Sequence, residues 1–220
     1  MSLGDEILSL VPKSEMRDIF CDFAEVALDS SLEEGVMKDI PVLGTLFKFG
    51  NVALAIKDRI FIKKVGRFLS ALDNIPAKEI ELFMNDLGDT KIRQMVGEKI
   101  VLLLDRQDDL DKTELLGEFF LQYVARKIDR ETFEMLSHSI SMTYLPDIAD
   151  LWYFDENPDF LDDALGLALA SSGLAVFTVD VFDLEASGTA KTKNRYRLSN
   201  LGNKLAHILK ERKERPVHAH

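Results

Sequence analysis

The sequence is poor in the residues that build covalent or catalytic centres. Of its 220 residues, one is cysteine and four are histidine. A single cysteine, Cys21, excludes an internal disulfide and suits a reducing compartment, and we expect it to be a buried small hydrophobe. No phosphate-binding loop, paired-histidine zinc motif, dinucleotide-binding turn or nucleophile elbow occurs. We therefore predict no catalytic residue, cofactor or metal site, and interpret His138 as an ordinary helical residue.

Positive charge is outnumbered by negative charge, and it is unevenly placed. The formal net charge is -11, and residues 145–190 contain ten acids and no Lys or Arg. Residues 41–70 hold six cations and one acid, and residues 191–220 hold nine and two. A chain of this charge does not wrap nucleic acid over its whole surface, so the two basic segments are the places where an anionic partner would bind. Because the first ten residues lack the pattern of a secretion signal, we expect a cytoplasmic protein.

Helical periodicity dominates residues 1–144, which we predict to form a helical bundle. Ser2 and Asp5 have the spacing of a capping box at the first helix. The acidic stretch 105–111 lacks the glycine and the bidentate acid of a calcium loop, so we interpret it as a joint between helices. The predicted inner faces are Ile19, Phe20, Phe23, Val26 and Ala27; Ile80, Leu82 and Phe83; Ile92, Met95, Val96, Ile100, Val101, Leu103 and Leu104; Leu115, Leu116, Phe119, Phe120, Tyr123 and Val124; and Phe133, Leu136, Ile140 and Met142.

Residues 40–72 are the least ordinary part of the chain. Lys48 is the one charge between residues 40 and 56, and a helix of that length measures roughly 26 Å, just short of a bilayer crossing. The residues after it form an amphipathic helix whose cations are Lys57, Arg59, Lys63, Lys64 and Arg67. We favour a buried central helix followed by a surface helix. The alternative is a membrane-associating effector in which residues 40–72 leave the bundle and these five cations contact anionic lipid, peripheral to the inner membrane.

The period of the pattern changes near residue 173. The pattern predicts two strands over residues 175–185 and 195–199, with a polar hairpin tip over 186–194. Asn200 is the expected cap of a last helix. Gly173-Leu174, and then Tyr196, Leu198, Ser199 and Gly202, stand in the arrangement of a winged helix-turn-helix, which residues 145–213 resemble. The fold class predicted is thus mainly α: a helical bundle over 1–144, a winged helix with a two-stranded hairpin over 145–213, and a tail over 214–220.

The resemblance implies DNA binding, but the residues in place disfavour sequence-specific recognition. The helix before the hairpin begins with Asp159, Asp162 and Asp163 and offers no base-reading side chain. Non-specific phosphate contact would use Lys191, Lys193, Arg195 and Arg197, together with Lys204, Lys210, Arg212, Lys213 and Arg215 of the last helix. Those cations alternatively form a solvated face or pair with the preceding acids. We therefore favour a non-enzymatic, bacterial-type cytoplasmic protein that contacts a protein partner, itself included, over the membrane effector and a DNA- or RNA-binding regulator.

Overall fold

The computed structural model of the protein describes residues 2–26, 56–155, 161–184 and 190–215. These residues are mainly helical, with a two-stranded antiparallel sheet near the C-terminus, as the sequence predicts. The chain forms two compact units, Met1–Phe133 and Glu134–His220, whereas the sequence prediction placed the boundary after residue 144. Outside the described residues lie Ala27, residues 40–55 of the apolar run, Asp159 and residues 216–220 of the predicted tail.

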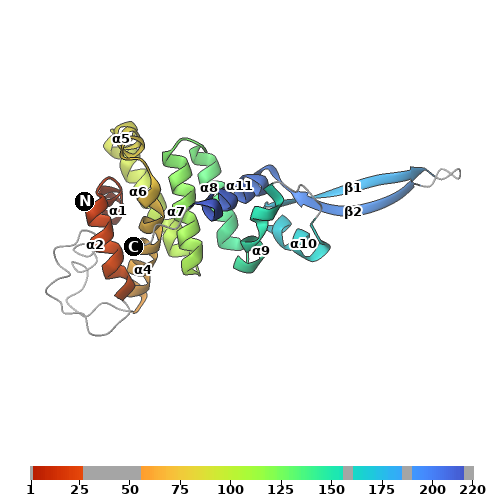
Figure 1. Cartoon of the computed structure of the whole chain (residues 1–220), viewed down its shortest axis with the longest axis horizontal. Coiled ribbons are helices and arrows are strands. Elements are labelled where there is room, and N and C mark those ends of the chain that lie inside the picture. Colours follow the sequence, from red (N-terminus) through yellow and green to blue (C-terminus); the bar gives the residue numbers. More distant parts are fainter. Residues whose placement is uncertain (1, 27–55, 156–160, 185–189, 216–220) are drawn as a thin grey trace. The chain divides into compact units, whose positions relative to one another are not determined.

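The N-terminal unit is built from helices that pack around α4 (Figure 1). Its elements are α1 (Leu3–Leu10), α2 (Ser14–Val26), α4 (Ile56–Ser70), η2 (Ala71–Asn74), α5 (Ala77–Asp86), α6 (Thr90–Arg106), α7 (Leu110–Val124) and the start of α8 (Arg130–Met142). The predicted capping box opens α1, because Ser2 and Asp5 each accept a hydrogen bond from the other's backbone N–H. Helix α4 contacts α2, α6, α7 and η2, and it is therefore fixed on several sides.

Glycine lets the helices of this unit approach closely. Helices α1 and α6 cross where Gly4 meets Gly97, and a methyl group on either would overlap the other's backbone. Gly117 of α7 lies against the carbonyl oxygen of Phe68 in α4 in the same way. Because no side chain separates these backbones, the positions of α6 and α4 are set by backbone contact.

Aromatic rings fill the core where α4, α5, α7 and α8 meet. Phe120 is fully buried, and its ring centroid lies 5.3 Å from that of Phe68 and 5.5 Å from that of Phe83. Tyr123 stacks on Phe133 at 5.6 Å. Contacts of this kind stabilise a core by about 0.5–1.5 kcal/mol per pair beyond simple burial, so Phe120 holds α4 firmly against the rest of the unit.

Most of the predicted inner faces are buried, but several residues assigned to them are exposed. The exceptions are Ile19, Val26, Leu82, Ile92, Met95 and Met142. Leu82 follows Ile80 by two positions, which places it on the far side of α5. Ile92 and Met95 precede the crossing of α6 with α1 at Gly97, and Val26 and Met142 are the last residues of their helices. Apolar periodicity identifies the face of a helix, but the neighbouring helices decide how much of its length is covered.

The C-terminal unit combines short helices with the hairpin (Figure 1). Its further elements are α9 (Leu145–Ala149), η3 (Leu151–Asp155), α10 (Asp163–Ser171), β1 (Ala175–Leu184), β2 (Ala190–Leu198) and α11 (Asn200–Glu214). Two local predictions are wrong. Strand β2 begins at Ala190 rather than Arg195, because residues 190–194 also pair with β1. The cap of α11 is Ser199 rather than Asn200, since the Ser199 hydroxyl accepts the backbone N–H of Gly202.

Candidate interaction surfaces

The five cations predicted to contact an anion lie along α4, and the predicted apolar face of that helix is in the core. Ile62, Val65, Phe68 and Leu69 are buried, whereas Lys57 is exposed and Arg59, Lys63, Lys64 and Arg67 are half-buried. The helix therefore does not offer its apolar face to a lipid surface while the unit is folded. Its opposite face remains accessible.

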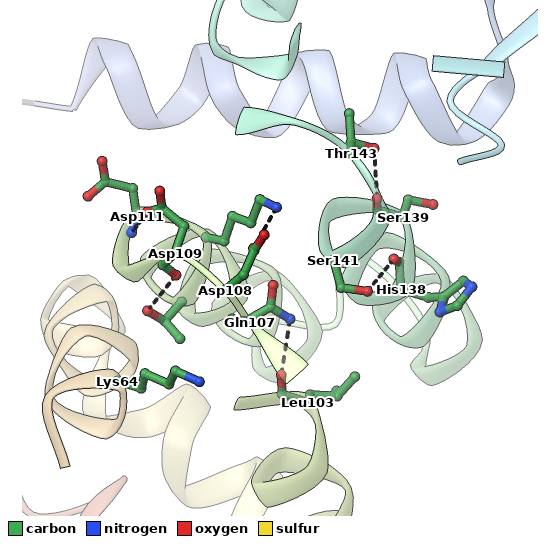
Figure 2. A network of polar contacts seen from close by, with 12 residues as sticks. Lys64, Leu103, Gln107, Asp108, Asp109, Asp111, His138, Ser139, Ser141 and Thr143 are labelled. Atoms are coloured by element: carbon green, nitrogen blue, oxygen red, sulfur yellow. Dashed lines mark hydrogen bonds and ion pairs between the residues drawn. The ribbon is translucent and has the colours of Figure 1, made fainter. Parts of the chain in front are cut away.

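Lys64 has a local partner. Its Nζ donates to the carbonyl oxygen of Asp105, 3.0 Å away, in the last turn of α6, where cations satisfy the unpaired carbonyls of a helix end. Figure 2 shows Lys64 near the joint of α6 and α7, at which Asp108, Asp109 and Asp111 gather. The hydrogen bond from the buried Lys112 to Asp108, 2.7 Å long, lowers the pKa of that exposed carboxyl. Lys64 thus has a structural task at the end of α6.

The acidic stretch 105–111 forms the predicted joint between helices. Asp109 caps α7 by accepting the N–H of Asp111 at 2.7 Å, and Gln107 donates back to the carbonyl oxygen of Leu103 (Figure 2). Within the parts of the chain that the structure describes, no three acidic, histidine or cysteine side chains converge as a metal site would require. His138 is exposed, and its carbonyl oxygen accepts the hydroxyl of Ser141 (Figure 2).

The register of the hairpin separates its residues into two chemically different faces. Directly opposite residues of an antiparallel pair share a face. One face carries no charged residue; its pairs are Ala175 with Leu198, Phe177 with Tyr196, Val179 with Asn194 and Val181 with Thr192. The other carries Val176 with Arg197, Thr178 with Arg195 and Asp180 with Lys193. We call the first the uncharged face and the second the charged face.

Among the described residues, α10 and Leu161 cover the uncharged face at its base. Gly166 of α10 lies against the Tyr196 ring, and Leu161 donates its N–H to the carbonyl oxygen of Tyr196 at 3.0 Å. Further out, Phe177 packs on Tyr196 at 5.4 Å between ring centroids and is still 50% exposed, and Val179 is 52% exposed. In Figure 1 the hairpin extends away from α10 and α11. Two large apolar side chains therefore remain accessible on a face without charge.

The four predicted phosphate contacts occupy every second position of β2, from 191 to 197. Lys191 stands opposite Asp183, and Lys193 opposite Asp180. Arg195 is half-buried, and Arg197 is exposed beside Val176 on the charged face. Two of these four cations thus stand opposite acids of β1, which lowers the net charge of the charged face.

The residues that carry the family resemblance meet at the base of the hairpin. Gly173 has a positive φ of 79°, which suits glycine, and its carbonyl oxygen accepts the Ser199 hydroxyl at 2.7 Å. The Ser199 backbone N–H donates to Leu174, and Gly202 lies so close to the Leu174 carbonyl that a side chain there would collide with it. These contacts join the end of α10, β1, β2 and the start of α11 into one packed joint.

Helix α10 presents an acidic and apolar outer side. Asp162 caps the helix by accepting the backbone N–H of Leu165 at 3.0 Å, and Asp163 is exposed beside it. Leu167, which is 64% exposed, follows one turn later. The strand alternation places Arg195 and Arg197 on the hairpin face opposite the one that α10 contacts. The outer side of α10 therefore keeps the negative charge that its sequence predicts.

Several cations of α11 serve contacts within the unit. Lys213 lies over the Trp152 ring with its Nζ 3.0 Å from the centroid, and Lys210 is 3.7 Å from a carboxylate oxygen of Asp155. His207 lies 3.3 Å from the same carboxylate. Two of the predicted phosphate contacts thus hold η3 to α11. Periodicity alone does not reveal this pairing, because η3 and α11 are far apart in the sequence.

Cys21 of α2 is partly buried against α4. Its thiol donates to the carbonyl oxygen of Gly66 at 3.5 Å, and burial, aided by Asp73 and Asp18, raises its pKa to about 12. This thiol is protonated at neutral pH and is a poor nucleophile.

None of the helices in the described part of the chain is both long enough and apolar enough to span a bilayer. Comparison of the chain with known protein families, curated proteins and solved structures finds no match. What the two surfaces do must therefore be inferred from their own geometry.

Proposed function

We propose that this is a non-enzymatic cytoplasmic protein that acts by binding another protein through the uncharged face of its hairpin, and that its C-terminal unit is a winged-helix module. The observation that carries the proposal is the pair of half-exposed apolar side chains, Phe177 and Val179, on a strand face that carries no charge. Apolar, charge-free strand faces fit protein surfaces, because their burial removes apolar area from water without desolvating an ion.

The length of the hairpin supports this role. Ten residues of β1 span roughly 33 Å, and an isolated two-stranded hairpin is only marginally stable in water. Within the described residues, α10 and α11 contact the strands near their base. A partner that packs on Phe177 and Val179 would extend this cover outward and stabilise the strands by burying both side chains.

Two features disfavour DNA as the partner. The exposed residues of α10 include Asp162, Asp163 and Leu167, which would repel a phosphate backbone or offer it nothing to bind. The lysines of β2 stand opposite acids, as described above. A winged-helix module that reads bases through the helix before its wing needs the reverse arrangement.

Site-specific photocrosslinking tests the proposal. The photoreactive analogue p-benzoyl-phenylalanine is placed at Phe177 on the uncharged face, at Arg197 on the charged face, or at Met95 of α6, which is 56% exposed and serves as the control. We expect irradiation in the native host to give a discrete protein adduct from position 177 and none from 95. An adduct with twice the mass of the chain would identify the partner as a second copy.

A second arm addresses nucleic acid directly. Fluorescence anisotropy with a labelled duplex is measured for the wild type, for Phe177→Ser/Val179→Ser and for Arg195→Gln/Arg197→Gln. The proposal predicts only weak, salt-sensitive duplex binding. Tight binding that the arginine pair abolishes, together with no protein adduct at 177, would replace the proposal with a nucleic-acid-binding function.

A further inference from the structure

The outward side of α4 carries apolar and cationic residues on one line. Ile56, Ile60, Lys63 and Arg67 are separated by four, three and four positions, the spacing of residues that lie above one another on a helix. Ile56 is 75% exposed and Ile60 40% exposed, although the same helix buries its opposite side in the core. We call these four residues the outer stripe of α4.

No acid shares the outer stripe. The one acid of α4, Asp58, is about half a helical turn away from Ile56, on the side of Ile62 and Val65. Lys57 and Arg59 flank the stripe, so residues 56–70 hold five cations and one acid in a chain of net charge -11. Neither Lys63 nor Arg67 forms an ion pair with another residue that the structure describes. The stripe is a local positive area on a negatively charged protein.

A soluble surface helix accounts for the cations but not for the isoleucines beside them. Single exposed apolar residues are common on proteins. Two exposed isoleucines on the same stripe as two cations form the pattern of a helix that lies at a lipid surface, where apolar side chains enter the boundary of the acyl chains and cations contact headgroup phosphates. A nucleic acid would engage the cations and leave the isoleucines in water.

We propose that the outer stripe of α4 binds the surface of an anionic phospholipid bilayer while the N-terminal unit stays folded. Ile56 and Ile60 insert shallowly, and Lys57, Lys63 and Arg67 contact the headgroups. Helix α4 does not leave the bundle, because its apolar side is already buried against α2 and α7. This proposal is independent of the hairpin function, since the residues belong to different units.

Vesicle sedimentation tests the charge requirement. The full chain is mixed with phosphatidylglycerol–phosphatidylcholine vesicles or with pure phosphatidylcholine vesicles. We expect sedimentation with the anionic vesicles, weaker binding at high salt, and a loss of roughly tenfold or more in Lys63→Gln/Arg67→Gln. The control is Lys78→Gln/Lys91→Gln, which removes the same charge from exposed positions of α5 and α6 and should bind as the wild type does. Failure of the wild type to sediment, or equal loss in the control, overturns the proposal.

Substitution of the isoleucines distinguishes binding to a membrane from binding to a polyanion. Ile56→Ser/Ile60→Ser should weaken vesicle binding several-fold and leave binding of the full chain to heparin unchanged. If this variant sediments with anionic vesicles as the wild type does, the stripe is a polyanion contact only, and the proposal fails.

Cys21 reports whether the unit stays folded at the membrane. Its thiol contacts Gly66 of α4, so labelling by a thiol reagent is slow while α2 and α4 remain packed. We expect the same slow rate with and without anionic vesicles. Acceleration toward the rate of the unfolded chain would show that α4 separates from α2, and would contradict docking of the intact unit.

Discussion

Helix α4 and the β1–β2 hairpin both combine cations with exposed apolar side chains, but they arrange them differently. On α4, Ile56 and Ile60 share one stripe with Lys63 and Arg67. On the hairpin, Phe177 and Val179 lie on the face without charge, and Arg195 and Arg197 lie on the other, where Val176 is also exposed. The difference indicates that composition alone does not select a partner. A surface that is apolar and cationic at the same place fits an anionic bilayer, whereas separated faces offer a charge-free area to a protein.

The contacts that hold the two regions in place also differ. The largest expected effect on stability concerns the core behind α4. Phe120→Ala removes a fully buried ring that packs on Phe68 and Phe83, and we expect the free energy of unfolding to fall by about 3–5 kcal/mol. Chemical denaturation measures this loss in the free energy of unfolding of the N-terminal unit. Leu82→Ala, at a half-exposed position of α5, is the control and should cost much less. Equal losses in both variants would mean that α4 is not held by this core.

The hairpin depends instead on a close backbone contact at its base. Gly202→Ala places a methyl group against the Leu174 carbonyl and should destabilise the C-terminal unit by about 1–3 kcal/mol, with loss of the crosslink expected at position 177. Asn203→Ala, at the next and exposed position of α11, is the matched control. Thermal unfolding of the two variants compares them. Unchanged stability in Gly202→Ala would refute the packed joint.

The smallest expected effect concerns the joint that Lys64 contacts. The pKa of Asp108 is lowered, mainly by the hydrogen bond from Lys112. The ionised carboxylate therefore stabilises the folded state at pH values above the ordinary pKa of an aspartate. This stabilisation is lost as the pH falls through the lowered pKa. Because Asp108 is largely exposed, Asp108→Asn should cost about 0.2–1 kcal/mol at neutral pH. Denaturation at pH 7 and at pH 3, values chosen on either side of the aspartate range, should show the difference shrinking at the lower pH. A difference that grows as the pH falls would contradict the assignment.

Local sequence patterns predicted much of the fold. The capping box at Ser2 and the buried side of α4 follow from spacing that involves neighbours in the chain. The exposure of Met95 could not be predicted in this way, because it depends on where α1 crosses α6.

The surfaces were harder to predict than the helices. The sequence identified the cations of α4 and β2, but the pairing register of the hairpin decides which of them stand opposite Asp180 and Asp183. A bulge between Val181 and Asp183 shifts that register, and turn chemistry alone does not locate it. The contact of Lys213 with Trp152 likewise joins residues far apart in the chain.

The most direct test of the contrast compares the two apolar pairs in one assay. Sedimentation with phosphatidylglycerol-containing vesicles is measured for the wild type, for Ile56→Ser/Ile60→Ser and for Phe177→Ser/Val179→Ser. We predict several-fold weaker binding when the isoleucines of α4 are changed and no change when the hairpin residues are changed. If the hairpin pair proves to be the one that vesicle binding requires, the assignment of the bilayer to α4 and of a protein partner to the hairpin is wrong.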